Sequence, residues 1–156
     1  MRRKIKRRKP VGPEYKYSSQ KIAQFINYTM EDGKKEVARR IVYGMLEDLK
    51  TTLKIENPVE VFELALKNVG PATEVRSRRI GGATYQVPRE VRPERKQALA
   101  FRWIIDAARA KKGAPIRKRL ADEIISASKN EGEAVKKREN TQKMAEANRA
   151  FAHFAW

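Results

Sequence analysis

The stretch Glu74-Val-Arg-Ser-Arg-Arg-Ile-Gly-Gly-Ala-Thr-Tyr-Gln-Val-Pro88 decides the fold, because here the periodicity of the chain changes from helical to extended. Two strand-like runs flank Gly81-Gly82, and a two-residue glycine loop is typical of a β-hairpin. We therefore predict a two-stranded β-hairpin over residues 73–89. The turn sets a register that pairs Ile80 with Ala83, Arg79 with Thr84, Arg78 with Tyr85, Ser77 with Gln86 and Arg76 with Val87.

The predicted hairpin has too little apolar area on either side to form its own core, and an isolated two-stranded ribbon is only marginally stable in water. We expect it to lean on helices at its base. Its arginine-rich sides should then face a ligand, with Tyr85 as a stacking platform. Pro88 should end the second strand, because its missing N–H costs little there.

Three amphipathic helices are predicted before the hairpin. The first follows a cap at Ser18 or Ser19 and ends at Gly33. The second has the most regular apolar spacing in the chain, and the third follows a cap at Asn57 and ends at Gly70. Their expected core positions are Ile22, Phe25 and Ile26; Val37, Ile41, Val42, Met45, Leu46, Leu49 and Leu53; and Phe62, Ala65, Leu66 and Val69.

Three more helices are predicted after the hairpin. The fourth begins at Pro93 and ends at Gly113, and Pro115 opens the fifth. Asn130 and Glu133 form a capping box for the sixth, which is poor in large apolar residues and should therefore meet something outside the core. The expected core positions are Leu99, Trp103, Ile104, Ala107 and Ala108 in the fourth helix and Ile116, Leu120, Ile124 and Ala127 in the fifth. The only large apolar residues of the sixth are Val135 and Met144.

These elements predict an all-α fold, namely a six-helix domain with a protruding two-stranded β-hairpin and a disordered basic N-terminal arm. We place the arm in residues 1–17 and a single helical domain in residues 18–156. Seven of the first nine residues are Lys or Arg. Such a segment cannot bury enough apolar surface to fold alone, so we expect it to become ordered on binding.

The charge of the chain points to a polyanionic partner. Its 156 residues carry 36 Lys and Arg against 19 Asp and Glu, a net charge of +17. Residues 1–31 carry a surplus of +7 and residues 76–119 one of +11, whereas the rest of the chain is nearly balanced. Because a surface that serves only solubility mixes its signs, the long basic stretch favours an anionic partner such as RNA.

The residue types present disfavour an enzyme. The chain has no cysteine and one histidine, His153, in an aromatic C-terminal segment. Thiol chemistry and a histidine-based metal cluster are therefore excluded, and we interpret His153 as a packing or stacking residue. Gly81-Gly82 and Gly33-Lys34-Lys35 lack the spacing of a nucleotide-binding loop, although a helix N-terminus at the second could bind a backbone phosphate. We expect no catalytic residue, no cofactor and no metal.

Two other partners compete with RNA. Proteins that bend DNA also combine helices with arginine-rich β-arms, but such arms commonly carry an apolar wedge where this chain has Gly81-Gly82. No apolar run approaches the ~18 residues of a membrane span, and the basic start of the chain lacks the apolar region of a secretory signal. The helices also use their apolar faces for a core rather than for an anionic membrane surface. We expect a cytosolic protein with no DNA or membrane partner.

Several motifs resemble one family. The hairpin stretch, followed by Glu90-Val91, Leu99-Ala100 and Arg102-Trp103, is similar to the hairpin and next helix of the small-subunit ribosomal protein seven family. The resemblance runs from about residue 18 to residue 156. It implies an all-α domain with a protruding ribbon and a non-enzymatic, structural role in the ribosome. Other stretches that resemble this family are Asp32-Gly33-Lys34-Lys35, Ala134-Val-Lys-Lys-Arg138, and Met144-Ala-Glu-Ala-Asn-Arg-Ala-Phe-Ala-His153 with Trp156.

The resemblance further implies primary binding to the 3′ major domain of 16S rRNA, nucleation of head assembly in the small subunit, and a cytoplasmic, ribosome-bound location. The ribbon and the C-terminal helix would approach messenger RNA and exit-site tRNA, with small-subunit ribosomal protein eleven and other head proteins as neighbours. Together with the basic clusters, it marks as rRNA-binding Arg2, Arg3, Lys4, Lys6, Arg7, Arg8, Lys34, Lys35, Arg76, Arg78, Arg92, Arg95, Lys96, Arg102, Arg109, Lys111, Lys112, Arg117, Lys118, Arg119, Lys136 and Lys137. The residues it implies near tRNA and messenger RNA are Arg79, Gly81, Gly82, Met144, Asn148 and Arg149.

Overall fold

The computed structural model describes residues 11–154. This part of the chain contains six α-helices, a two-stranded antiparallel ribbon and a short 3-10 helix, so the predicted fold class is confirmed. The elements in chain order are α1 (Gln20–Thr29), α2 (Lys35–Leu53), α3 (Pro58–Val69), β1 (Thr73–Ile80), β2 (Ala83–Glu90), α4 (Pro93–Ala110), α5 (Ile116–Ser128), α6 (Glu133–Ala147) and η1 (Arg149–Phe154).

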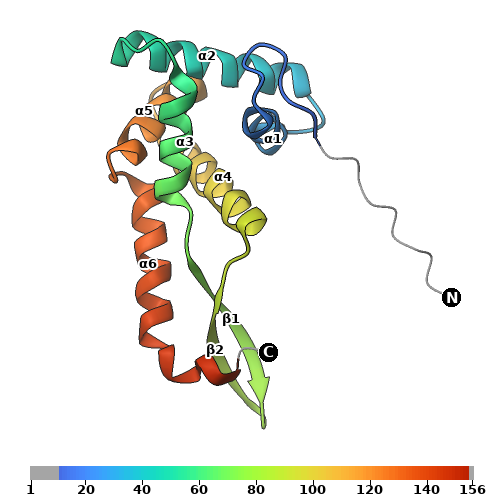
Figure 1. Ribbon diagram of the computed structural model, residues 1–156, viewed down its shortest axis with the longest axis vertical. Coiled ribbons are helices and arrows are strands. Elements are labelled where there is room, and N and C mark those ends of the chain that lie inside the picture. The colour runs from blue at the N-terminus through green and yellow to red at the C-terminus, as the bar shows by residue number, and fades with distance from the viewer. Residues whose placement is uncertain (1–10, 155–156) are drawn as a thin grey trace, which may run out of the picture.

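The molecule is elongated (Figure 1). Helices α1 to α5 gather at one end, and the ribbon extends away from them with α6 running beside it. The 3-10 helix η1 then returns from the end of α6 to the far part of the ribbon. None of the helices in residues 11–154 is long and apolar enough to cross a membrane.

The core lies among α1 to α5 and is centred on three buried phenylalanines. Phe25 of α1 contacts Phe62 of α3 and Phe101 of α4, with ring centroids 5.2 and 5.5 Å apart. Aromatic pairs in such tilted or edge-to-face geometry add to the stabilisation from burial. Trp103 is also buried, as predicted from its spacing on the fourth helix.

Helix α2 buries Val42, Met45, Leu46 and Leu49 as predicted, but not the start of the predicted row. Val42 and Met45 are fully buried, but Val37 is 52% exposed and Ile41 only partly buried. A row spaced by four residues drifts around the helix by about 40° per step. The first residue of the row therefore leaves the core face, and Ala38 takes its place there.

Two helices end earlier than predicted. Helix α1 ends at Thr29 rather than at Gly33, and α4 ends at Ala110 rather than at Gly113. The residue after each helix is already extended, and both glycines lie in the turns that follow, with φ of +72° and +90°. Each glycine thus serves the left-handed conformation of a turn rather than the helix end itself. At the start of α1, Ser19 occupies the cap position without a side-chain hydrogen bond.

The predicted capping box at the start of α6 is wrong. Asn130 lies in a turn with φ of +61°, and the helix begins after Gly132. One N–H of its first turn, that of Ala134, donates instead to Glu123 of α5, a fully buried carboxylate, at 3.0 Å. By contrast, the cap predicted at Asn57 is confirmed, because its side chain accepts from the Val59 N–H at 3.2 Å.

The hairpin has the predicted register throughout, including the pairs Arg78 with Tyr85 and Arg76 with Val87. Its second strand continues to Glu90, so Pro88 lies within the strand and not at its end. A two-stranded ribbon leaves part of each strand's N–H groups unpaired, and a proline is tolerated at such a position.

The far part of the ribbon is held by η1, an element that was not predicted. Tyr85 of β2 contacts Phe151 and Phe154 of η1, with ring centroids 5.1 and 5.7 Å apart. Tyr85 therefore packs against the chain's own C-terminal segment, which corrects its expected role as a free stacking platform. These contacts give the ribbon the support that two strands alone lack.

Part of the segment assigned to the basic arm is packed on the domain. Glu14 is buried and accepts hydrogen bonds from Arg39 at 3.1 Å and from the Tyr43 hydroxyl at 2.6 Å, and the Tyr17 ring lies 5.7 Å from the Tyr43 ring. Residues 14–17 thus lie against α2. The prediction of a disordered arm otherwise falls on residues 1–10, which lie outside the described residues, as do Arg2, Arg3, Lys4, Lys6, Arg7 and Arg8.

Candidate nucleic-acid interface

The base of the ribbon joins two of the predicted arginines through one carboxylate. Glu74, which is only 9% exposed, accepts from Arg76 at 3.0 Å and from Arg95 of α4 at 3.2 Å. Both arginines bond through Nε while their side chains stay about half exposed (52% and 42%). The arrangement fixes β1 against α4 and still leaves guanidinium surface to grip phosphate oxygens.

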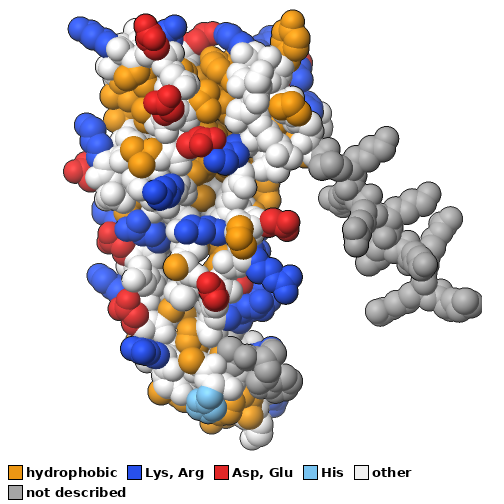
Figure 2. Space-filling view, viewed as in Figure 1, with side chains coloured by type: hydrophobic (Ala, Val, Ile, Leu, Met, Phe, Trp, Pro, Cys, Tyr) orange, Lys and Arg blue, Asp and Glu red, His pale blue; other side chains and the backbone are white. Residues whose placement is uncertain are grey.

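The ribbon beyond this base carries further cations. Arg79 is exposed next to the turn, where Gly81 and Gly82 adopt φ of +57° and +88°. Lys and Arg side chains gather over the start of the ribbon, below α4, in Figure 2. A groove of about 670 Å³ follows the ribbon. It is lined by Arg76, Ser77, Arg78, Val87, Pro88, Arg89, Glu90 and Ala152.

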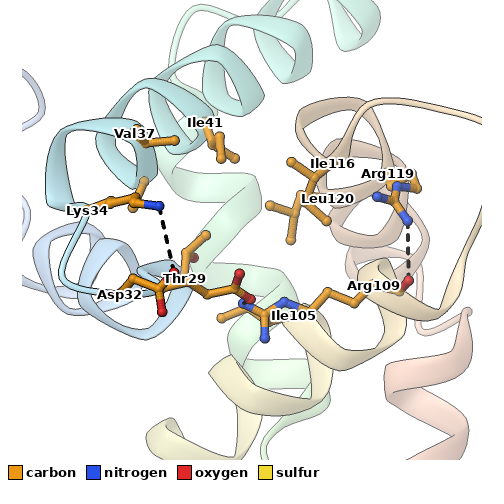
Figure 3. Close-up of a pocket in the computed structure, with 12 residues that line it drawn as sticks. Thr29, Asp32, Lys34, Val37, Ile41, Ile105, Arg109, Ile116, Arg119 and Leu120 are labelled. Atoms are coloured by element: carbon orange, nitrogen blue, oxygen red, sulfur yellow. Dashed lines mark hydrogen bonds and ion pairs between the residues drawn. The ribbon is translucent and has the colours of Figure 1, made fainter.

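A second group of charged residues surrounds a pocket of about 370 Å³ between the α1–α2 turn, α2, α4 and α5 (Figure 3). Arg109 of α4 bonds Glu31 at 2.6 Å, and Lys34 lies 3.7 Å from Asp32. Apolar side chains from three helices point into the space between them, including the exposed Val37. The pocket thus has an apolar interior and a rim of mixed charge.

Three of the predicted cations on and before α5 have partners within the chain. Lys111 bonds the buried Glu123 at 2.6 Å, and Arg117 bonds Asp48 of α2 at 2.8 Å. Arg119 donates to the main-chain carbonyls of residues 109 and 111 and so holds the α4–α5 turn. We therefore assign these three a structural part in addition to any contact with a ligand.

Helix α6 carries two predicted cations that also form ion pairs. Lys136 bonds Glu133 at 2.7 Å, and Lys137 lies 3.6 Å from Asp106 of α4. The hydrogen bond between the first pair raises the pKa of Lys136 and lowers the pKa of Glu133. Both lysines are exposed, and exposed pairs of this kind contribute little to stability.

The remaining predicted residues lie at the surface or at element ends. Met144 is 54% exposed, Asn148 ends α6 by donating to the Met144 carbonyl at 2.7 Å, and Arg149 begins η1. The aliphatic stem of Lys96 covers Gly70, where a Cβ atom would lie 2.8 Å from it. The other predicted cations are exposed and lie in helices or in the segments between them, namely Lys35, Arg92, Lys112 and Lys118.

Several residues of the basic surfaces were missed in the sequence. Arg89 pairs with Glu74 across the ribbon and lines its groove. Tyr28 of α1 is exposed beside Arg102 of α4, and only its place three residues after Phe25, at the edge of the apolar stripe, could have indicated it. Sequence periodicity identifies the buried face of a helix. It does not identify which residue of another helix will contact a side chain at the edge of that face.

The side chains that could bind a metal ion do not gather in the described part of the chain. No group of three or more His, Cys, Asp or Glu side chains in residues 11–154 could hold a metal ion. His153 is exposed, with Nδ1 2.9 Å from the Ala150 carbonyl and its ring 3.9 Å from that of Phe154. The groups that could contact a ligand are therefore cations, amides and aromatic rings.

Comparison with known proteins gives one consistent result. The family model described as ribosomal protein S7p/S5e matches residues 1–149. The chain belongs to this family. It is 56% identical over 149 residues to the small ribosomal subunit protein uS7 of Francisella philomiragia subsp. philomiragia and to those of Francisella tularensis subsp. holarctica and subsp. novicida, covering 96% of this chain and 95% of each relative. The family resemblance drawn from the hairpin is thereby confirmed.

Membership in the S7p/S5e family accounts for the basic character of the surfaces described above. The family is structural and non-enzymatic, so this chain is a ribosomal protein and not an enzyme. A ribosomal, rRNA-binding context also explains the charge of +17.

Proposed function

We propose that this chain, a structural constituent of the small ribosomal subunit, is a primary binder of the 3′ major domain of 16S rRNA and nucleates assembly of the head. In this proposal residues 18–156 act as one RNA-binding domain, and the basic side chains of residues 1–17 bind the same RNA, with residues 14–17 lying against α2. The protein is ribosome-bound in the cytoplasm. The observation that carries the proposal is the ribbon whose base is fixed by Glu74 while Arg76 and Arg95 stay about half exposed.

The two ends of the ribbon take different parts in this function. At its base, the guanidinium groups of Arg76 and Arg95 are already positioned by Glu74, so they can bind phosphate oxygens of a folded RNA without first changing conformation. At its tip, Arg79 and the Gly81-Gly82 turn let a backbone approach closely, since glycine has no side chain there. We assign the tip, with Met144, Asn148 and Arg149, to messenger RNA and exit-site tRNA, and the C-terminal part to contact with small-subunit ribosomal protein eleven and other head proteins.

Chemical footprinting of a transcript of the 3′ major domain, with and without the protein, tests the proposal directly. We expect protection of a defined set of nucleotides in the presence of the protein. An unchanged modification pattern at saturating protein would overturn it. Duplex DNA of equal length serves as competitor and should not displace the transcript, because the glycine tip offers no apolar wedge for DNA bending.

A charge-matched pair of variants separates a ribbon site from a general effect of charge. The triple change Arg76→Ala, Arg78→Ala and Arg79→Ala should weaken RNA binding while helical circular dichroism persists. The control replaces three exposed lysines of α2, the turn after it, and α3 by alanine and should bind almost as the parent does. Equal losses in both would remove the ribbon from the site. The control lysines are Lys50, Lys54 and Lys67.

A further inference from the structure

Helices α1 and α4 lie side by side (Figure 1). Residues of both line a second, smaller groove, of which the sequence indicated only Arg102 and Arg109. Its volume is about 530 Å³. One wall is fixed by a hydrogen bond from Gln97 of α4 to Gln24 of α1 at 2.9 Å. The groove is lined by Val11, Gln24, Asn27, Tyr28, Arg102, Ile105, Asp106 and Arg109.

The groove contains a flat, partly exposed aromatic group. Tyr28 is 37% exposed, and its ring lies 5.4 Å from that of the buried Phe101, which limits its movement. The guanidinium of Arg102 lies over the Tyr28 ring, 5.8 Å from its centroid. Tyrosine rings and arginine guanidinium planes are the two kinds of group on which unpaired RNA bases stack.

The charge of the groove fits a nucleotide better than an apolar partner. Arg102 and Arg109 both come from α4. Val11, which also lines the groove, follows in sequence a segment with seven Lys and Arg in its first nine residues. Glu31 and Lys137 pair with Arg109 and Asp106, respectively. Asn27 and Asp106 also line the groove and add amide and carboxylate groups to it.

We propose that this groove holds an unpaired base of the RNA, stacked on the Tyr28–Arg102 pair, with phosphates of the same strand against Arg109. The proposal rests on the proposed function, because it assigns one further contact to the same RNA partner. It adds a contact that reads an unstacked base rather than the backbone, since stacking requires a base free of its helix. The pocket of Figure 3 shares Ile105 and Arg109 with the groove and would lie next along that strand.

Two variants of Tyr28 test the stacking contact against a transcript of the 3′ major domain in filter-binding titrations. Tyr28→Leu should lower affinity by about 5- to 150-fold, the range for loss of one base–aromatic stack. Tyr28→Phe keeps the ring and should bind within about twofold of the parent. The slope of log affinity against log salt should be the same in all three proteins, because no cation is removed.

The titrations distinguish failure of the stacking contact from failure of the proposed function. If the parent binds and Tyr28→Leu binds equally well, the stacking contact is overturned and the proposed function stands. If Tyr28→Leu and Tyr28→Phe lose affinity equally, the hydroxyl and not the ring is responsible, and the inference also fails. If the parent itself does not bind, the proposed function fails.

A third variant keeps the inference testable should Tyr28→Leu not fold. Tyr28→Trp retains a stacking ring and places an indole in the groove. Its added fluorescence should be quenched when the transcript binds, beyond the change seen in the parent protein. Absence of this extra quenching, with RNA binding intact, would show that the groove takes something other than a base, such as a side chain of a neighbouring protein.

Discussion

Removing the Tyr85 ring should loosen the ribbon without loosening the helical core. The ribbon is two strands wide, and its far part is held by the contacts of Tyr85 with Phe151 and Phe154. Both contacts lie outside the α1–α5 core, whose buried rings belong to other elements. We therefore expect Tyr85→Ala to act on a local opening and not on global unfolding.

The size of the effect follows from the two ring contacts. An aromatic pair contributes about 0.5–1.5 kcal/mol beyond the area it buries. Loss of both pairs therefore weakens the closed ribbon by about 1–3 kcal/mol, which raises its opening equilibrium by about 5- to 150-fold. Because an isolated ribbon is only marginally stable, a change of this size is enough to leave the ribbon tip open for a substantial part of the time.

Native-state hydrogen exchange measures this opening residue by residue. Amide groups of β1 and β2 should exchange about 5- to 150-fold faster in Tyr85→Ala, whereas those of α2 to α4 should keep their rates. Tyr15→Ala is the matched control, because that ring is 98% exposed, and it should change neither set. Unchanged exchange in the ribbon, or an equal increase in the core helices, would refute the reasoning.

Two further perturbations test other parts of the structure. Glu123→Ala removes the buried acceptor of the Ala134 N–H and the partner of Lys111. It should lower the free energy of unfolding by about 2–4 kcal/mol in denaturant titrations, and Glu123→Gln should lower it less. Equal stability of all three proteins would argue against a capping role of Glu123. Burial and the hydrogen bond to Glu14 raise the pKa of Tyr43 to about 12. The fold therefore favours the protonated phenol, and its contribution to stability is complete below about pH 10 and lost as the pH rises through about 12. Absorbance titration should show that the Tyr43 phenol ionises late, and Glu14→Gln should bring its pKa down; an unchanged pKa in Glu14→Gln would contradict this cause.

Features set by neighbours in sequence were predictable. The Gly81-Gly82 turn fixes the register of the ribbon, because a two-residue loop leaves one way to pair the strands. Asn57 caps α3 from two residues before Val59, and this signal is equally local. In both cases the residues that determine the structure lie within a few positions of one another.

Features set by distant residues were not predictable in this way. The start of α6 is determined by Glu123, eleven residues earlier on another helix, and the Asn130 signal near it proved misleading. The position of Tyr85 depends on a C-terminal segment whose helical turn has no periodic signal. Such contacts follow from how the helices pack and not from the pattern along any one of them.

The residues of the candidate site were also predictable only where the signal is local in the sequence. Clusters of charge showed which stretches are basic, but not which cations would be held by the chain's own carboxylates. Lys111 and Arg117 pair with Glu123 and Asp48. Tyr28 lies beside Arg102, but counting charges cannot identify an uncharged residue of a basic surface.

The central claim is that the cations of this chain displace counter-ions from folded RNA. The measurement that tests it most directly is the affinity of the intact protein for the 3′ major domain transcript as salt is raised from about 50 to about 200 mM. If six to ten phosphates are neutralised, affinity should fall by about 10³- to 10⁵-fold over that range. An affinity that stays constant across it would contradict the account.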